Sequence, residues 1–343
     1  MKHAMPELVG NTRLKEALCR DILAGSLSHA IILEGAKGTG KHTVAKLCAT
    51  ALACEHKEDP SLPIPCMTCR ACRKVTEGNC PDVIVVGSEG KATVGVDTVR
   101  FLREDVRVLP NDLDFKIYII EDADRMTVQA QNALLLTLEE PPAYVRFFLL
   151  CENAGLLLET IRSRAPILRT EPIEREALDA YLTAHDIRAA QMKLSAPEDY
   201  AALLMSAGCG IGRAMALLDP KVFAPIKENR ALVEELARAA LQKKGASHIL
   251  PLVARFASKR DLLREQLSLL SDAARDLVLL KKYENAPLTF YHDRNTAIEL
   301  CDGVSIQFLC QFEAAVRRAI EENTRNANVR LMLIRMVSSL ELL

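Results

Sequence analysis

The sequence of 343 residues has almost no net charge, no apolar run of membrane length and no low-complexity segment. Its net charge of −1 gives no overall basic character, so any contact with nucleic acid has to be local or supplied by partner proteins. The longest apolar stretches, Ile117–Ile120 and Phe147–Cys151, have the length of strands and are too short to cross a bilayer. The N-terminus also lacks the apolar core of a signal peptide, so we expect a cytoplasmic protein.

Short apolar segments alternate with helical patterns over the first half of the chain. Segments of this kind are typical of parallel strands that helices cover on both faces, so the sequence predicts an α/β fold there. The expected strands are Ala30–Glu34, Val83–Val86, Ile117–Ile120, Phe147–Leu150 and Ile167–Arg169.

The strand signals stop after about residue 172. Three helices are expected next, over Glu174–His185, Asp199–Ala207 and Ile211–Leu218, and helical spacing of apolar residues continues from residue 222 onward. The sequence therefore predicts an α/β domain over residues 1–172, a small helical domain over 173–220 and a helical bundle over 221–343.

Residues 35–43 read GAKGTGKHT, a phosphate-binding loop in which one expected residue is missing. The Walker A pattern GxxxxGK[ST] has a hydroxyl after the lysine because its oxygen holds Mg²⁺, and this chain has His42 there. An imidazole is a poor ligand for this hard ion, and the next residue is rotated by about 100° around the helix. The sequence predicts a loop that can contact phosphate but has impaired metal binding. Its candidate residues are Gly35, Gly38, Gly40, Lys41, His42 and Thr43.

The apolar strand expected over Ile117–Ile120 ends in two acids, Glu121 and Asp122. This is the Walker B arrangement, which brings one carboxylate near the magnesium ion and another near the attacking water. The usual order is Asp then Glu, and here it is reversed. Solvated acids at a strand end are the alternative interpretation.

Four cysteines are spaced as C-x11-C-x2-C-x2-C, and they are Cys54, Cys66, Cys69 and Cys72. Four thiolates complete a tetrahedral Zn²⁺ site, and they leave no open position for a catalytic water. The segment between the first two cysteines is proline-rich with little apolar material, so a structural metal would hold it together. An iron–sulfur cluster and four unrelated buried thiols are the alternatives.

Glu139 and Glu140 end the helix expected over residues 128–140, immediately before Pro141. Two negative charges in the last turn oppose the helix dipole. A functional surface would explain this unfavourable placement, and solvated carboxylates are the other interpretation.

Together these motifs resemble those of bacterial DNA polymerase III clamp-loader subunits of the AAA+ class. The resemblance spans essentially the whole chain and is densest over residues 28–165. It rests on His29-Ala30, the P-loop, the four-cysteine segment, Gly78–Asp82, Asn132–Pro142 and Ser163–Ala165. It implies an AAA+ P-loop domain with a zinc insert, a helical lid domain and a helical collar domain that mediates oligomerisation.

Within this family, an ATP-hydrolysing gamma/tau motor subunit would keep the hydroxyl after the P-loop lysine and the Asp-Glu order. This chain has His42 and Glu121-Asp122 instead, and it has no extension after the collar of the kind found on tau. The three features favour a delta-prime subunit with a slow or absent ATPase. The resemblance then implies a pentameric ring with gamma/tau and delta subunits, which loads the beta sliding clamp onto primed DNA.

The resemblance also implies roles for three polar residues. Arg164 would be the finger that reaches the ATP of an adjacent motor subunit, Asn153 would be a sensor residue, and Arg213 would be a second sensor at a helix start. Ordinary surface residues are the alternative for each. Two other functions stay open, namely a true motor with unusual motifs and a P-loop protein whose zinc insert binds nucleic acid.

Overall fold

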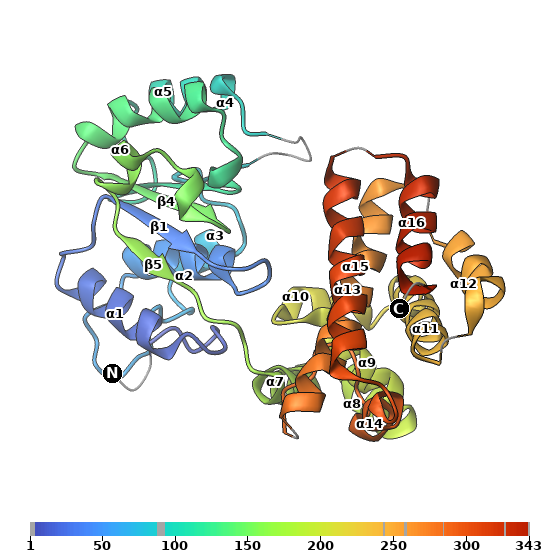
Figure 1. The fold of residues 1–343 in the computed structure, drawn as a ribbon. Coiled ribbons are helices and arrows are strands. Elements are labelled where there is room, and N and C mark those ends of the chain that lie inside the picture. The colour runs from blue at the N-terminus through green and yellow to red at the C-terminus, as the bar shows by residue number, and fades with distance from the viewer. Residues whose placement is uncertain are drawn as a thin grey trace. The chain divides into compact units, whose positions relative to one another are not determined.

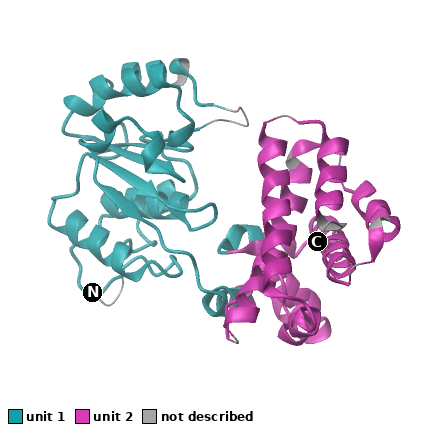
Figure 2. Ribbon diagram, in the orientation of Figure 1, with its two compact units in different colours: residues 1–182, 209–213 teal, residues 183–208, 214–343 magenta. Residues whose placement is uncertain are grey.

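The computed structural model describes residues 4–87, 93–242, 244–256, 259–283, 285–325 and 327–341. The chain separates into two compact units, coloured in Figure 2: residues 1–182 with 209–213, and residues 183–208 with 214–343. The expected division into three domains remains a prediction. Over the described residues, no helix combines the length and the apolar character that crossing a bilayer requires.

A five-stranded, all-parallel sheet with the order β2-β3-β4-β1-β5 forms the centre of the first unit (Figure 1). Its strands agree with the five expected from the sequence to within two residues at either end. They are β1 (Ala30–Glu34), β2 (Val83–Val86), β3 (Lys116–Ile120), β4 (Val145–Cys151) and β5 (Ile167–Arg169). This parallel sheet with helices on both faces, followed over the described residues by helices, confirms the expected α/β fold with a mostly helical region after it.

Helices cover both faces of this sheet, as continuous apolar strands require (Figure 1). Alternate strand residues enter two separate cores, so that Ile31 and Leu33 pack on one side and Ala30 and Ile32 on the other. The first core includes α1 (Thr12–Leu23), α2 (Lys41–Ala53) and α3 (Arg70–Thr76). The second includes α4 (Val96–Asp105), η1 (Ala123–Arg125), α5 (Val128–Glu139), η2 (Ala154–Leu156) and α6 (Glu159–Arg162).

The second unit is helical throughout its described residues. Its largest core joins five long or medium helices and α14, with Leu263, Leu267 and Phe312 fully buried at its centre. That core is formed by α11 (Pro220–Leu241), α12 (Gly245–Ala254), α13 (Arg260–Lys282), α14 (Arg294–Cys301), α15 (Ile306–Thr324) and α16 (Val329–Glu341). The unit also contains α8 (Ile187–Ser195) and α9 (Pro197–Ala207). Two further helices, α7 (Arg175–His185) and α10 (Ile211–Leu217), contain residues of both units.

The segment expected to hold three helices contains a fourth, α8, which sequence reasoning missed. Asp186 begins it by accepting a hydrogen bond from the Arg188 amide at 2.9 Å, and Pro197 starts the following helix. Its large apolar residues Ile187 and Leu194 are 76% and 87% exposed. The helix has nine residues, and Ala189 is the one it buries, so it contributes little apolar surface to a core.

Candidate functional site

The phosphate-binding loop joins the end of β1 to the start of α2, as its motif predicts. Gly38 and Gly40 have φ angles of 90° and 86°, which side chains with a Cβ atom rarely adopt. A Cβ atom on Gly38 would lie 2.9 Å from the Gly210 Cα atom, and the Cys209 thiol donates to the Lys37 carbonyl at 3.7 Å. The loop backbone therefore lies against residues 209–213, which belong to the same compact unit.

Buried hydroxyl groups attach the same loop to the chain that follows β5. The Thr39 and Thr170 hydroxyl oxygens are 2.6 Å apart, and Thr39 also donates to the Ala36 carbonyl at 2.9 Å. Asn11 adds a second link, because its amide nitrogen donates to the Thr39 carbonyl and its amide oxygen accepts from the Glu171 amide. The loop is thus held in shape without a bound ligand.

The Lys41 ammonium group lies over the loop backbone. It donates to the Gly35 carbonyl at 2.6 Å and to the Ala36 carbonyl at 2.9 Å. An ammonium on a flexible stem can exchange carbonyl partners for phosphate oxygens, and the first amides of α2 are available at the same loop. The loop therefore has the groups that bind a phosphate.

His42 and Glu121, which lie far apart in the sequence, meet beside this loop. The His42 Nε2 atom is 3.6 Å from Glu121 Oε1, and the two side chains are 48% and 43% exposed. Thr43 is exposed on the next position of α2, and Asp122 begins η1 in the left-handed region with φ of 50°. The His42 imidazole and the Glu121 carboxylate thus lie side by side where the P-loop approaches the end of β3.

These residues do not fit a magnesium ion of the usual kind. Magnesium needs oxygen ligands in near-octahedral geometry, and the hydroxyl that would supply one is replaced by a nitrogen ligand of the wrong hardness. The same imidazole lies against the acid that would supply another oxygen. This loop can contact phosphate, but its own residues make a poor magnesium site.

Asn153, the expected sensor, uses its side-chain oxygen locally. It accepts from the Gly155 amide at 2.8 Å, while its own amide donates to Asp124 at 3.1 Å. Asp124 also accepts from the Glu152 amide at 3.0 Å, so it fixes the turn after β4 to the end of β3. A sensor function for Asn153 therefore remains a prediction.

Glu34, the last residue of β1, is a site residue that sequence reasoning missed. Its carboxylate accepts from the Ala154 amide at 2.9 Å and from Arg169 Nε at 2.8 Å. The Arg169 guanidinium and this amide hold the pKa of the Glu34 carboxyl below its ordinary value. An acid directly before the glycine loop was the available signal, but its partners come from β5 and η2.

The two arginines singled out in the sequence have different surroundings. Arg213 is exposed near the start of α10, in the segment 209–213 that packs against the P-loop. Arg164 follows α6 and donates to Glu139 Oε1 at 2.9 Å and to the Thr160 carbonyl at 2.9 Å. It is therefore an accessible side chain with a partner in its own chain.

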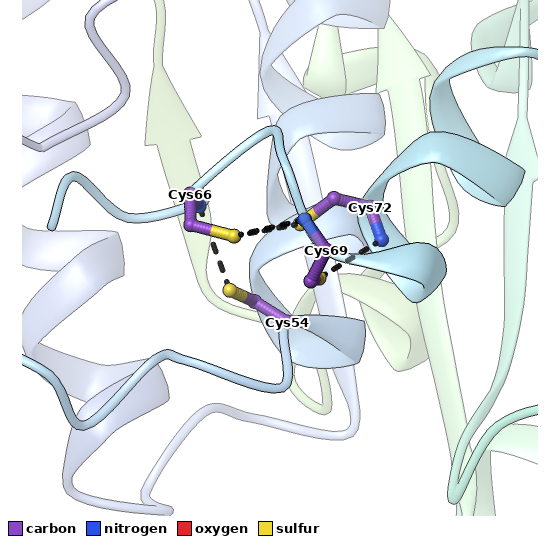
Figure 3. Close-up of side chains that lie close together, drawn as sticks. All are labelled: Cys54, Cys66, Cys69 and Cys72. Atoms are coloured by element: carbon purple, nitrogen blue, oxygen red, sulfur yellow. Dashed lines mark hydrogen bonds between the residues drawn. The ribbon is translucent and has the colours of Figure 1, made fainter.

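The four spaced cysteines come together in one buried cluster (Figure 3). Their sulfur atoms all lie within 4.8 Å of one another, and the Cys66 and Cys72 sulfurs are 3.9 Å apart. Zinc–sulfur bonds of about 2.3 Å in a tetrahedron give sulfur–sulfur distances of about 3.8 Å. Three backbone amides donate to these sulfurs: Cys66 to Cys54 at 3.5 Å, Cys69 to Cys66 at 3.4 Å and Cys72 to Cys69 at 3.4 Å. The donor set and its geometry fit a tetrahedral metal such as Zn²⁺.

The family described as DNA polymerase III, delta subunit, matches residues 10–174, which contain the P-loop, the cysteine cluster and Arg164. A relative named DNA polymerase III subunit delta' from Bacillus subtilis is 32% identical over 233 residues, covering 68% of this chain and 66% of the relative. The chain belongs to the DNA polymerase III clamp-loader family.

Other clamp-loader relatives match about half of the chain. DNA polymerase III subunit tau of Bacillus subtilis is 34% identical over 172 residues, which is 50% of this chain and 30% of the relative. Subunit gamma of Buchnera aphidicola from Acyrthosiphon pisum is 30% identical over 176 residues, which is 51% of this chain and 47% of the relative. The chain thus matches less than half of the length of these two relatives.

Among solved structures, a gamma subunit-related protein of DNA polymerase III from Thermotoga maritima is similar to this chain. It has 19% sequence identity and a TM-score of 0.44, over 95% of this chain and 98% of the other. RuvB of the same organism, a Holliday junction branch migration motor, has 16% identity and a TM-score of 0.41, over 90% and 86% of the two chains.

Proposed function

We propose that this chain is the delta-prime subunit of the DNA polymerase III clamp loader and that it helps load the sliding clamp onto primed DNA without hydrolysing ATP itself. The observation that carries the proposal is the contact between His42 and Glu121, with Nε2 and Oε1 3.6 Å apart. A motor subunit needs a hydroxyl and an acid at this place to hold magnesium.

The loop keeps the groups with which an ATPase binds phosphate but lacks a ligand with which it binds magnesium. Lys41 and the loop amides can bind phosphate, as their contacts with the loop backbone indicate. Hydrolysis further requires a metal that bridges the β- and γ-phosphates and neutralises the developing charge. Because His42 offers no oxygen for that metal, we infer that the chain can hold a nucleotide but turns it over slowly or not at all.

The length of one match supports the proposal, although tau, gamma and delta' subunits match the chain at similar identity. The match to the Bacillus subtilis delta' subunit covers 233 residues, whereas the match to the tau subunit of the same organism covers 172 residues. A similarity that continues beyond the P-loop domain is expected for a subunit of the same type. By this proposal the partners are gamma/tau and delta subunits in a pentameric cytoplasmic ring, with the beta clamp and primed DNA bound by the complex.

Arg164 is the residue by which we propose that the chain takes part in catalysis. Its side chain is 36% exposed, so it can contact a group outside its own chain. A planar fork of N–H donors suits the charge that develops on phosphate oxygens during transfer, and a finger of this kind is worth about 10³–10⁵ in rate in other phosphoryl-transfer enzymes. Arg164 would supply this fork to the ATP of the adjacent motor subunit.

The cysteine cluster would hold one structural Zn²⁺. Its four sulfurs leave no coordination position for water, so the ion would supply no Lewis acid chemistry. Cys69 is the N-cap residue of α3, and α2 is followed directly by Cys54. A metal at this place would therefore join the end of α2 to the start of α3.

The proposal is tested by the ATPase activity of the purified chain and of its complex. The isolated chain should release no phosphate from ATP with magnesium, and turnover that Lys41→Ala abolishes would make it a motor subunit instead. In a complex with gamma-type motor subunits and delta, Arg164→Ala should assemble normally and lower clamp- and DNA-stimulated ATPase. The neighbouring exposed Arg162→Ala is the matched control, and equal activity of all three complexes would contradict the role of Arg164.

A further inference from the structure

Arg164 is held at two points within its own chain. One terminal nitrogen of the guanidinium donates to the Thr160 carbonyl at 2.9 Å and to the Ser163 hydroxyl at 3.3 Å, so it caps the end of α6. The other donates to Glu139 Oε1 at 2.9 Å. The contacts with Thr160 and Ser163 hold one terminal nitrogen at the end of α6, and the contact with Glu139 directs the other toward α5.

Glu139 stands where a carboxylate is unfavourable. It is the last residue of α5, and a negative charge there faces the negative end of the helix dipole. Its ion pair with Arg164 supplies the compensating positive charge. Glu140, the next residue and equally acidic, has no ion pair among the contacts of the described residues. The two adjacent acids therefore differ in their relation to Arg164.

We propose that Glu139 is a positioning residue that holds Arg164 in its own chain until the phosphates of a nucleotide on a neighbouring subunit displace it. This inference rests on the proposed trans role of Arg164. Carboxylate and phosphate oxygens both accept hydrogen bonds from the planar guanidinium of arginine, so they compete for the same outer nitrogen. A triphosphate has more negative charge than one carboxylate, so the exchange occurs only when a correctly placed nucleotide is present.

The strength of the pair sets the size of the effect. Both side chains are partly exposed, at 36% and 45%, so the pair is weak and easily exchanged. Exposed ion pairs of this kind change an equilibrium by about 1.5- to 5-fold. Removing the charge of Glu139 should therefore increase, by this factor, the fraction of molecules in which Arg164 does not contact residue 139. The hydrogen bond to the Thr160 carbonyl would still hold the Arg164 side chain at the end of α6.

The test uses four variants of the chain in the complex with motor subunits: Glu139→Gln, Glu140→Gln, Arg164→Ala and the double variant Glu139→Gln/Arg164→Ala. We expect Glu139→Gln to raise the kcat for ATP about 1.5- to 5-fold without clamp or DNA and to leave KM unchanged, because a finger acts on the transition state. Glu140→Gln should match the wild type. The double variant should equal Arg164→Ala, because Glu139 acts through Arg164.

A second measurement needs no partner. In the free chain, NMR of ¹⁵N-labelled arginine should show faster rotation of the Arg164 guanidinium in Glu139→Gln than in wild type or Glu140→Gln. Unchanged kcat in Glu139→Gln, together with the expected loss in Arg164→Ala, would overturn the inference alone. A complex in which Arg164→Ala has no effect would overturn the proposed function and this inference with it.

Discussion

The Thr39 hydroxyl lies 2.6 Å from the Thr170 hydroxyl, and this contact joins the P-loop to the residue that follows β5. Both side chains are buried, with 1% and 7% of their surface exposed. Thr170 also donates its backbone amide to the Glu34 carbonyl at 2.8 Å, which extends the pairing of β1 and β5 by one residue. The shape of the loop therefore depends on the edge of the sheet.

Replacing Thr170 by valine should loosen this edge. The change keeps the side-chain shape but removes the hydroxyl contacts with Thr39 and with the Glu34 carbonyl. We therefore expect a loss of about 1–2 kcal/mol in the free energy of unfolding of the first unit. Hydrogen exchange of the β1 and P-loop amides measures it. Thr43→Val removes an exposed hydroxyl from the same loop and should change this free energy by less than about 0.5 kcal/mol. Equal effects of both variants would contradict the role given to the contact.

Replacing His42 by serine should restore a magnesium ligand. We expect the wild-type chain to bind ATP with an affinity that magnesium changes less than about twofold, and His42→Ser to gain about tenfold from magnesium. Calorimetry with excess magnesium or with EDTA measures both. His42→Ala removes the imidazole without supplying an oxygen, so it should gain nothing. A strong magnesium dependence in the wild type would show that the imidazole does not prevent metal binding.

The cysteine cluster should bind about one zinc ion per chain, and Cys66→Ala should abolish it, because three thiolates in this site hold the ion far more weakly. Elemental analysis measures the metal, and faster hydrogen exchange over α3 should accompany its loss. Cys80→Ala is the control, since Cys80 is also buried but lies outside the cluster. A metal content that stays the same in Cys66→Ala would exclude this residue as a ligand.

Asp276 should stabilise the second unit by accepting hydrogen bonds from consecutive backbone amides. Its fully buried carboxylate accepts from the amides of Thr289, Phe290 and Tyr291 at 2.7–3.2 Å. Asp276→Asn replaces one acceptor oxygen by a donor, and we expect a loss of about 2–3 kcal/mol in the free energy of unfolding of this unit. Urea unfolding followed by hydrogen exchange in α13 measures it. Asp302→Asn, on an exposed residue, should have an effect below about 0.5 kcal/mol.

Cysteine alkylation should be selective for Cys310 in the native protein. Burial raises the pKa of the Cys19 thiol to about 11 and that of the Cys151 thiol to about 12, so both stay protonated at about pH 8. Cys310 is exposed on α15. Mass spectrometry after iodoacetamide treatment should find its adduct first, and Cys310→Ser should remove that adduct. Early modification of Cys19 or Cys151 would show that the first unit opens under native conditions.

Much of the first unit could be predicted from the sequence because its signals are local. The strands are short apolar runs, and the P-loop is marked by glycines whose φ angles are positive. The helix α8 was missed because it is short, with nine residues, and its large apolar side chains Ile187 and Leu194 lie outside the core. Glu34 was missed because residues of η2 and β5, far along the chain, supply its partners.

The chemical groups of this protein follow from its residue types and their spacing. These patterns identified the defective P-loop, the four thiols and the clamp-loader family, because they need no knowledge of distant contacts. Which of these groups contact one another depends on the tertiary structure. Thr39 reaches Thr170 across 131 residues and Arg164 reaches Glu139 across 25, because the order of parallel strands and the packing of α5 against α6 bring them together. Residue spacing does not reveal these long-range contacts, because they depend on how whole helices and strands pack.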